Sequence, residues 1–299
     1  TALMTATSKE DGSFSFEGIP YGTWYIREIE QPAGFVLDDT VYPVSIGKDA
    51  QVVEIKIVNK YIRGNIHLTK VDAEYPDNKL TGATFEVYKD SNGSGKLDDG
   101  DELLGTLTEK EIGSYEMKDL FYGRYFVKET KAPEGFVLDT GVYEVMIDTD
   151  GKTCEVENKA GVGFINEAMR GNLKIVKTSS DGKIKGFAFR ITGANGYDII
   201  LETNDKGEIV IEGIRIGDYT VSEVSNSASA MYVLPADKKA TVKLGSTTIV
   251  EMHNVLRDTP KTGDATNLPL LYALAGLSAV GIAVCGVIGF KKKKKEDRN

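Results

Sequence analysis

The sequence predicts an all-β protein made of β-sandwich domains in tandem. Valine, isoleucine, tyrosine, phenylalanine and threonine recur in short runs that alternate with polar residues, and 32 glycines punctuate the 299 residues. Alternation with a period of two is typical of strands that bury one face. Hydrophobic residues make up 41% of the chain, which is enough for packed cores, and the net charge of −9 argues against a nucleic-acid partner.

Internal repeats set the predicted domain organisation. The segment WYIREIEQPAGFVLD at 24–38 matches YFVKETKAPEGFVLD at 125–139. A second motif, FEGIPYGTWY at 16–25, matches MKDLFYGRYF at 117–126 and IEGIRIGDYT at 211–220. These matches indicate three copies of one unit that follow each other with almost no linker.

We therefore expect a partial β-sandwich at 1–60 and complete β-sandwiches at 64–167 and 171–256. Turn sequences such as DSNGSG, DTDG, SSDG and NDKGE separate the expected strands. The first copy begins at a position equivalent to Glu102 of the second copy, so we expect its first strands to lie upstream of Thr1.

One glutamate in each copy shares the parity of the apolar residues on its strand. Glu129 lies in register with Tyr125 and Val127, and Glu28 and Glu223 hold the corresponding positions in the first and third copies. Each carboxylate is therefore expected to point into the core, where an unpaired charge is costly.

Lysines and asparagines follow the same pattern on the first and last strands of the copies. Lys70 and Lys177 have inward parity on the opening strands, and Asn59, Asn166 and Asn254 have it on the closing strands. One interpretation is a buried Lys–Glu ion pair with a hydrogen-bonding asparagine. Another places these strand-end residues in solvent at the rim of the sandwich.

A third interpretation is chemical. Burial lowers the pKa of a lysine and raises that of a glutamate, so the neutral amine can attack the asparagine amide while the protonated acid assists. The products are a Lys–Asn isopeptide bond and ammonia. We expect the cross-links Lys70–Asn166 and Lys177–Asn254, whereas the lysine partner of Asn59 would lie upstream of Thr1.

A second asparagine of the middle copy, Asn158, also has inward parity. We prefer Asn166 because it precedes the next inward lysine, Lys177, by the same eleven residues that separate Asn59 from Lys70.

These residues carry a resemblance to a known family. The repeats resemble the B-type, prealbumin-like (reverse immunoglobulin-like) domains of collagen-adhesin and SpaA-type pilin proteins, and VKETKAPEGF at 127–136 resembles the E-box of that family. The resemblance implies an intramolecular cross-linking triad of lysine, glutamate and asparagine. It also implies a structural protein on the surface of a Gram-positive bacterium, rather than an enzyme acting on other molecules.

The C-terminal region predicts a membrane anchor. Residues 268–290 carry no charge and are long enough for a transmembrane helix, and the tail at 291–299 begins with five lysines, which places it in the cytoplasm. A linker at 257–267 precedes the span and resembles the Leu-Pro-x-Thr-Gly sorting signal of cell-wall proteins. The motif residues are Thr259, Pro260, Lys261, Thr262 and Gly263.

The sorting signal implies a sortase that cleaves between Thr262 and Gly263 through an acyl-enzyme. A peptidoglycan precursor or a pilin lysine would then release the product. The resemblance therefore implies covalent attachment to the cell wall, with the membrane as a partner only before sorting.

The loop DSNGSGKLDDGDE at 90–102 resembles a calcium-binding loop. The candidate ligands are Asp90, Asn92, Ser94, the carbonyl of Lys96, and Asp101. The other interpretation is a polar hairpin loop at 90–101 without a metal. No other cofactor is expected.

Three functions fit the sequence. The first is the stalk of a sortase-anchored adhesin or minor pilin. The second is a binding module, in which the repeats themselves hold a host extracellular-matrix protein or glycan. The third is the C-terminal tether of a wall-anchored enzyme.

Overall fold

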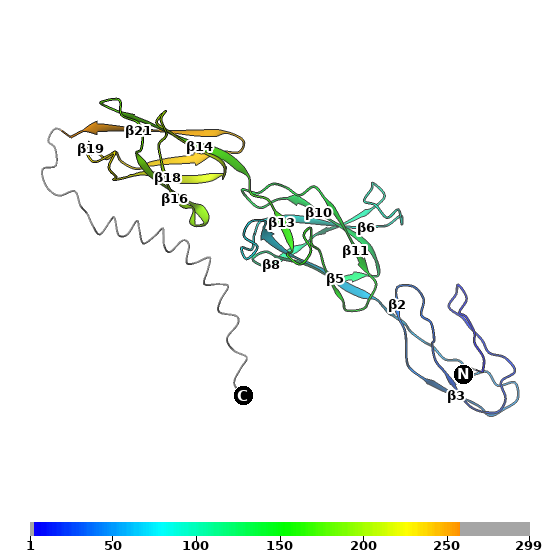
Figure 1. Ribbon diagram of the computed structural model, residues 1–299. Coiled ribbons are helices and arrows are strands. Elements are labelled where there is room, and N and C mark those ends of the chain that lie inside the picture. Colours follow the sequence, from blue (N-terminus) through cyan, green and yellow to red (C-terminus); the bar gives the residue numbers. More distant parts are fainter. Residues whose placement is uncertain (1–2, 258–299) are drawn as a thin grey trace, which may run out of the picture. The chain divides into compact units, whose positions relative to one another are not determined.

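The computed structural model describes residues 3–257, and its regular elements are almost all strands (Figure 1). The only helical element among these residues is a 3-10 turn, η1 (Ala194–Gly196). The all-β prediction is therefore confirmed. The chain divides into two compact units, Thr1–Met169 with the first and second repeats and Arg170–Asn299 with the third.

The predicted anchor lies beyond the part of the chain that the structure describes. The sorting motif at 259–263, the span at 268–290 and the tail at 291–299 all fall outside residues 3–257. Within residues 3–257, no helix has the length and apolar character needed to cross a membrane.

The second repeat is a sandwich of two sheets. One sheet has the order β11-β10-β6-β7, and the other has the order β12-β5-β9-β8, with β13 also paired to β5. The strands are β5 (Arg63–Asp72), β6 (Thr84–Lys89), β7 (Glu102–Thr106), β8 (Thr108–Glu111), β9 (Ser114–Phe121), β10 (Gly123–Lys131), β11 (Val142–Ile147), β12 (Thr153–Glu155) and β13 (Phe164–Asn166).

The core of this sandwich follows from the alternation in the sequence. Ile66 and Leu68 of β5 and Phe85 of β6 are fully buried, as is Val127 of β10. They belong to one hydrophobic cluster that takes side chains from both sheets. Since successive residues of a strand point to opposite faces, the residues two positions further along β5 and β10 enter the same core.

The third repeat has the same plan. Its sheets have the orders β17-β14-β21-β19 and β16-β15-β18-β20. The strands are β14 (Arg170–Ser179), β15 (Ala188–Gly193), β16 (Asp198–Glu202), β17 (Glu208–Arg215), β18 (Gly217–Val224), β19 (Tyr232–Val233), β20 (Lys238–Val242) and β21 (Thr247–Leu256).

The closing strands of the two sandwiches differ. In the third repeat β21 runs unbroken and parallel to β14. In the second repeat the closing strand is divided into β12 and β13, which pair with β5 at two separate places. Residues 156–163 lie between the two pieces, where the third repeat has only Val250 and Glu251.

Glycine is the second residue of the first strand of each sandwich, because the strand passes close to the main chain of a neighbouring turn there. A Cβ atom on Gly64 would lie 2.8 Å from the carbonyl oxygen of Lys152. A Cβ on Gly171 would clash with the carbonyl of Lys243 in the equivalent place. The recurrent RGN sequence therefore marks the point where the opening strand meets the turn before the closing strand.

The first repeat contains only part of this plan within residues 3–61. Its strands β1 (Gly22–Ile26) and β3 (Tyr42–Ile46) form one pair, and β2 (Phe35–Val36) and β4 (Lys60–Tyr61) form another. Residues 3–61 include no segment equivalent to β5 or β6, and the inward residues Trp24 and Ile26 are only half-buried among them.

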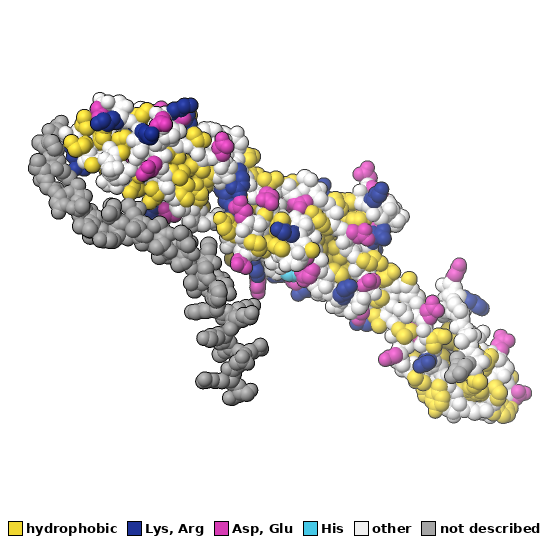
Figure 2. All heavy atoms as spheres, viewed as in Figure 1, with side chains coloured by type: hydrophobic (Ala, Val, Ile, Leu, Met, Phe, Trp, Pro, Cys, Tyr) yellow, Lys and Arg dark blue, Asp and Glu magenta, His cyan; other side chains and the backbone are white. Residues whose placement is uncertain are grey.

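The surface carries charges of both signs. On the face shown in Figure 2, Lys and Arg side chains lie interspersed with Asp and Glu side chains among the described residues. Interspersed charge is typical of a solvated surface.

Candidate cross-linking site

The candidate site of the second repeat is built from both sheets. Lys70 lies on β5 and Asn166 on β13, while Glu129 lies on β10 of the other sheet. Strands β5 and β13 run parallel, with Lys70 opposite Phe164 and Asn166 opposite Asp72. Residues two positions apart share one face of a sheet, so the lysine and the asparagine are diagonal neighbours on the inner face.

All three side chains are shielded from water. The exposed fraction is 0% for Lys70 and Glu129 and 3% for Asn166. The ring of Phe164 lies beside the amine, with its centroid 5.7 Å from Nζ. Lys70 Nζ donates hydrogen bonds to the carbonyls of Phe164, at 3.1 Å, and Val71, at 3.3 Å. These contacts hold the amine against the strand that carries Asn166.

The acid and the amide are joined by a hydrogen bond, yet each keeps one oxygen without a partner. Asn166 Nδ2 donates to Glu129 Oε2 at 2.8 Å and to the carbonyl of Val137 at 2.8 Å. The main-chain N–H of Asp139 donates to the same Oε2 at 2.8 Å. Glu129 Oε1 and Asn166 Oδ1 are buried without a hydrogen-bond partner.

This pattern favours a protonated glutamate. A buried acceptor without a donor costs about 1–3 kcal/mol. A carboxylate can only accept, whereas a protonated carboxyl group has one O–H donor. A single proton on Glu129 would therefore supply a donor in a pair whose two unpartnered atoms are both acceptors.

Burial moves both ionisable groups toward their neutral forms. Desolvation lowers the pKa of Lys70 to about 8, although the charges of Glu129, Asp139 and Asp72 oppose the shift. Desolvation also raises the pKa of Glu129, against the lowering effects of the Asp139 N–H, the Asn166 amide and the Lys70 charge. A neutral amine is a nucleophile and a neutral carboxyl group is a proton donor, so the arrangement suits amide chemistry.

The third repeat holds the same three residue types in the same register. Lys177 of β14 lies opposite Met252 of β21, and Asn254 lies opposite Ser179. Glu223 comes from β18 of the other sheet. The lysine is again the diagonal neighbour of the asparagine on the inner face.

The third repeat shares with the second the acid–amide hydrogen bond and the two oxygens without a partner. Lys177, Glu223 and Asn254 are all buried. Asn254 Nδ2 donates to Glu223 Oε1 at 2.7 Å, and Glu223 Oε2 and Asn254 Oδ1 have no partner. Desolvation lowers the pKa of Lys177 and raises the pKa of Glu223. The ring of Phe187 lies 4.0 Å from the amine Nζ.

The first repeat contains the acid and the amide alone. Asn59 Nδ2 donates to Glu28 Oε2 at 2.6 Å and to the carbonyl of Val36 at 3.2 Å. The N–H of Asp38 donates to the same Glu28 oxygen at 2.8 Å. Both side chains are half-buried. The geometry of the acid–amide pair is therefore already set within residues 3–61, although no opening strand is among these described residues.

The alternative asparagine, Asn158, makes different contacts. Its Nδ2 donates to Asp139 Oδ2 at 2.6 Å and to the carbonyl of Ile165 at 2.8 Å, and its Oδ1 accepts the N–H of Ile165 at 2.6 Å. Glu129 is therefore hydrogen-bonded to Asn166, whereas Asn158 is hydrogen-bonded to Asp139 and to the main chain of Ile165 in β13.

Sequence reasoning missed a second carboxylate next to the site. Tyr143 donates its hydroxyl to Asp139 Oδ2 at 2.9 Å, and in the first repeat Tyr42 donates to Asp38 Oδ2 at 2.5 Å. The aspartate and the tyrosine stand four residues apart in both copies, and this shared spacing was a signal in the sequence.

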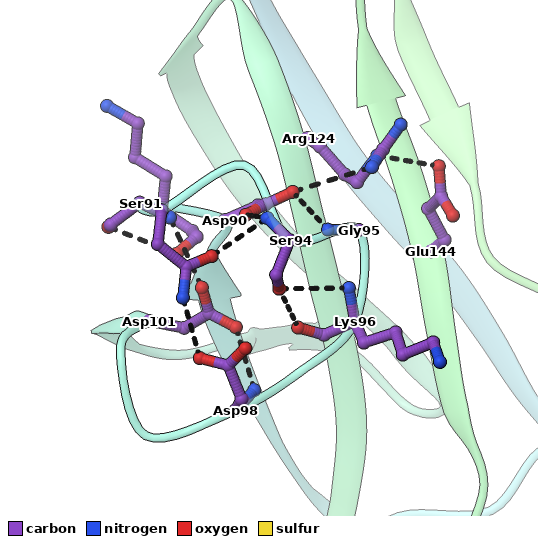
Figure 3. Close-up of polar contacts among 11 residues, drawn as sticks. Asp90, Ser91, Ser94, Gly95, Lys96, Asp98, Asp101, Arg124 and Glu144 are labelled. Atoms are coloured by element: carbon purple, nitrogen blue, oxygen red, sulfur yellow. Dashed lines mark hydrogen bonds and ion pairs between the residues drawn. The ribbon is translucent and has the colours of Figure 1, made fainter.

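The loop at 90–101, which joins β6 and β7, is drawn in Figure 3. Asp90 Oδ1 accepts the N–H of Ser94 at 3.1 Å, and Asp90 Oδ2 accepts that of Gly95 at 3.1 Å. Arg124 Nη1 lies 3.5 Å from the same Oδ2. The two oxygens of the first candidate calcium ligand therefore already have partners.

The remaining candidate ligands bind within the loop. Asn92 Nδ2 donates to Asp98 Oδ1 at 2.8 Å, and Ser94 Oγ donates to the carbonyl of Lys96 at 2.8 Å. Asp101 Oδ2 accepts the N–H of Asp98 at 3.0 Å. In the described part of the chain, no three His, Cys, Asp or Glu residues are grouped so as to hold a metal ion. Calcium binding stays a prediction.

Known proteins resemble this chain over most of its length. The trypsin-resistant surface T6 protein of Streptococcus pyogenes serotype M6 is 28% identical over 240 residues, which is 80% of this chain and 38% of that protein. The solved structure of the Bacillus anthracis TIE protein is 24% identical with a TM-score of 0.62, and the match covers 84% of this chain and 45% of that one. The chain thus spans less than half the length of either protein.

A solved streptococcal ancillary pilin matches 81% of this chain and 77% of its own at 21% identity, with a TM-score of 0.30. The SpaA family, described as a prealbumin-like fold domain, matches residues 2–61, 64–160 and 171–255. These three ranges correspond to the three repeats. The chain therefore belongs to the SpaA family of prealbumin-like fold domains.

Proposed function

We propose that this chain is a stalk segment of a Gram-positive cell-surface protein, an adhesin or minor pilin, and that Lys–Asn isopeptide bonds reinforce it. Family membership and the likeness to a streptococcal surface protein support the structural role. The observation that carries the cross-link is the buried Lys–Glu–Asn set, which recurs in both complete repeats with the same two unpartnered oxygens.

The reaction in the second repeat starts from the neutral amine of Lys70 and the protonated carboxyl of Glu129. Nζ attacks Cγ of Asn166 while Glu129 donates a hydrogen bond to Oδ1. The Nζ–Cγ bond forms, the Cγ–Nδ2 bond breaks, and Nδ2 leaves as ammonia. The proton that Nζ loses reaches Nδ2 through Glu129, so the acid ends in the form in which it began.

The fold supplies much of the rate because it holds the reactants together away from water. Well-oriented intramolecular reactions reach effective molarities of roughly 10⁵ M or more. Lys177, Glu223 and Asn254 take the same roles in the third repeat. Glu28 and Asn59 would take them in the first repeat once a lysine-bearing strand is present.

The position of the bond gives it a mechanical role. In each complete repeat the lysine lies on the opening strand and the asparagine on the closing strand. A force that enters at one end of the repeat therefore leaves through the cross-link, without loading the rest of the sandwich. The T6 protein is named as trypsin-resistant, and we propose the same property for this chain because a cross-linked sandwich opens rarely.

The anchoring step is part of the same proposal. We expect a sortase to cleave between Thr262 and Gly263 and to transfer Thr262 to an amine of a peptidoglycan precursor or of a pilin. Replacing Thr262 by alanine should move the protein from the cell-wall fraction to the membrane fraction. An unchanged wall fraction would contradict the assignment of the motif.

Intact mass spectrometry of the full chain tests the cross-links. The chain should weigh less than its translated sequence by two molecules of ammonia. The Lys70→Arg chain should lack one of these losses, and the Lys70→Arg/Lys177→Arg chain should lack both. A chain whose mass equals that of its translated sequence would refute the proposal.

A further inference from the structure

Asp139 links the acid of the second repeat to a second group of hydrogen-bond donors. Its main-chain N–H binds Glu129 Oε2 at 2.8 Å. Its side chain accepts the N–H of Gly141 at 2.6 Å, the hydroxyl of Tyr143 at 2.9 Å and the amide of Asn158 at 2.6 Å. One residue thus holds the catalytic acid and carries a second carboxyl group close to it.

The Asp139 side chain is held ionised. Burial alone would raise its pKa, but the hydrogen bonds from Asn158, Gly141 and Tyr143 outweigh this effect, so the pKa of Asp139 lies below its ordinary value. Burial, followed by the hydrogen bond to Asp139, raises the pKa of Tyr143 to about 12. The tyrosine therefore stays a donor to a negative Asp139 at neutral pH.

The third repeat lacks this residue. The sequence FVLD at 136–139 corresponds to YVLP at 232–235, so Pro235 stands where Asp139 stands in the second repeat. Proline has no N–H to donate and no carboxylate. Glu223 Oε1 accepts the Asn254 amide, and its other oxygen has no partner.

The first repeat agrees with the second. Asp38 donates its N–H to Glu28 and accepts the Tyr42 hydroxyl and the N–H of Thr40. The same contacts therefore occur around Asp38 and Asp139, although residues 3–61 form only part of a sandwich. This recurrence indicates that the aspartate accompanies the glutamate and does not depend on the packing of one complete sandwich.

We propose that Asp139 is a positioning residue for the cross-link of the second repeat: its N–H fixes the orientation of Glu129, and its charge sets the pH range in which the bond forms. The third repeat, with Pro235, forms its bond without this control. The inference rests on the proposed isopeptide chemistry and adds a residue that the Lys–Glu–Asn set does not include.

The direction in which Asp139 shifts the pH dependence of bond formation follows from the charges around Lys70 and Glu129. The groups that act on the reacting pair are Lys70 and Glu129 themselves, together with Asp139 and Asp72, and Tyr143 lies beside Asp139. The negative charge of Asp139 favours the protonated form of both Lys70 and Glu129. The reaction needs the amine neutral and the acid protonated, so its rate rises with pH as Lys70 deprotonates and falls as Glu129 ionises.

The side-chain charge of Asp139 therefore moves both limits of the pH profile upward, whereas its N–H lowers the pKa of Glu129. The Asp139→Asn chain keeps the N–H and nearly the same shape but loses the charge, so both limits should move to lower pH. Below the lower limit the variant should form the bond faster than the unsubstituted chain, and above the upper limit it should form it more slowly. A merely structural defect would slow the reaction at every pH.

The experiment starts from full chains made with a photocaged lysine at position 70. The caged chain is unfolded in guanidinium and illuminated there, so that the amine is freed before it meets Asn166. Dilution into buffers from about pH 5 to about pH 10 then starts folding, and the loss of ammonia is followed by intact mass after acid quenching. The bond between Lys177 and Asn254, formed before purification, is the internal reference.

The Pro235→Asp substitution provides the reverse test in chains caged at position 177. The added charge should move the pH limit that Lys177 sets upward, and a folding defect cannot produce that shift. The added N–H opposes the effect of the charge on the pKa of Glu223, so the test uses the limit that Lys177 sets. Asp139→Asn should leave the profile of the third repeat unchanged.

The possible outcomes separate the two proposals. A chain without ammonia loss at either site would overturn the isopeptide chemistry and this inference with it. Bond formation with superimposable pH profiles in the unsubstituted and Asp139→Asn chains would overturn the role of Asp139 alone. Slower reaction at every pH in Asp139→Asn, combined with an unshifted Pro235→Asp profile, would also overturn it.

Discussion

Replacement of Glu129 by glutamine separates the proton transfer from the packing. Glutamine has nearly the same shape and can still donate an N–H to an acceptor such as Asn166 Oδ1. It cannot transfer a proton from the amine to the leaving nitrogen. The Glu129→Gln chain should therefore fold without the cross-link between Lys70 and Asn166, while the bond of the third repeat still forms.

The expected loss of stability follows from the loop that the bond closes. Lys70 and Asn166 enclose about 100 residues, and in the chain-entropy model a cross-link of that span contributes about 4–5 kcal/mol. For a domain of this size, such a loss lowers the unfolding temperature by on the order of 20 °C. The lost hydrogen bonds of one buried side chain account for only about 1–3 kcal/mol, so the two causes can be told apart by size.

Differential scanning calorimetry, with intact mass measured on the same samples, provides the assay. The transition of the second repeat should move to lower temperature, and that of the third repeat should stay in place. The Lys70→Met chain, which cannot form the bond, should show a similar shift. The double variant should be less destabilised than the sum of the two, because both changes remove one bond. Two ammonia losses in the Glu129→Gln chain would refute the assigned role of the acid.

Three further predictions concern the same repeat. Asn158→Ala should keep both ammonia losses and Asn166→Ala should keep one, because only Asn166 contacts the acid; the reverse result in intact mass would exchange their roles. The Asn166→Ala chain keeps a free Lys70 amine. Burial lowers the pKa of this amine to about 8 in the folded chain, compared with its ordinary value of 10.5 in the unfolded chain. Its stability should rise with pH between these values, since the unfolded chain binds more protons there, and a flat stability profile in chemical denaturation would contradict the burial of the amine. Calcium should leave the unfolding temperature of this repeat unchanged, because the carboxylates of the loop already accept main-chain N–H groups; a rise that Asp101→Ala abolishes would instead establish a calcium site.

The positions of the three site residues could be read from the sequence because strand parity decides which face a side chain occupies. Once Val127 and Leu68 were assigned to the core, Glu129 and Lys70 followed two residues further along their strands. Comparison between copies then located the closing asparagine, because spacing between repeats is kept even where the closing strand is interrupted.

Other features depend on contacts that residue types do not reveal. The bond from the Asp139 N–H to Glu129 is made by the main chain, and any residue except proline could make it. The proposed role of this bond depends on the comparison with Pro235, which stands in the equivalent place and has no N–H. The division of the closing strand into β12 and β13 also escaped the parity argument, because residues 156–163 interrupt the pairing and the register resumes after them.

The loop at 90–101 illustrates a different limit. Aspartate, asparagine, serine and glycine at short intervals are typical of calcium loops and also of turns in which side chains accept main-chain N–H groups. Asp90 and Asp101 make contacts of the second kind. Composition alone does not separate the two cases.

Peptide mapping of the trypsin-digested chain, after unfolding, tests the central claim most directly. The cross-link blocks cleavage after Lys70, so tandem mass spectrometry should find residues 64–79 joined to residues 160–170 through Lys70 and Asn166, with the loss of one ammonia. The third repeat should give residues 175–183 joined to residues 244–257. Recovery of the linear peptide 64–70 together with an unmodified 160–170 peptide, in full yield, would contradict the account.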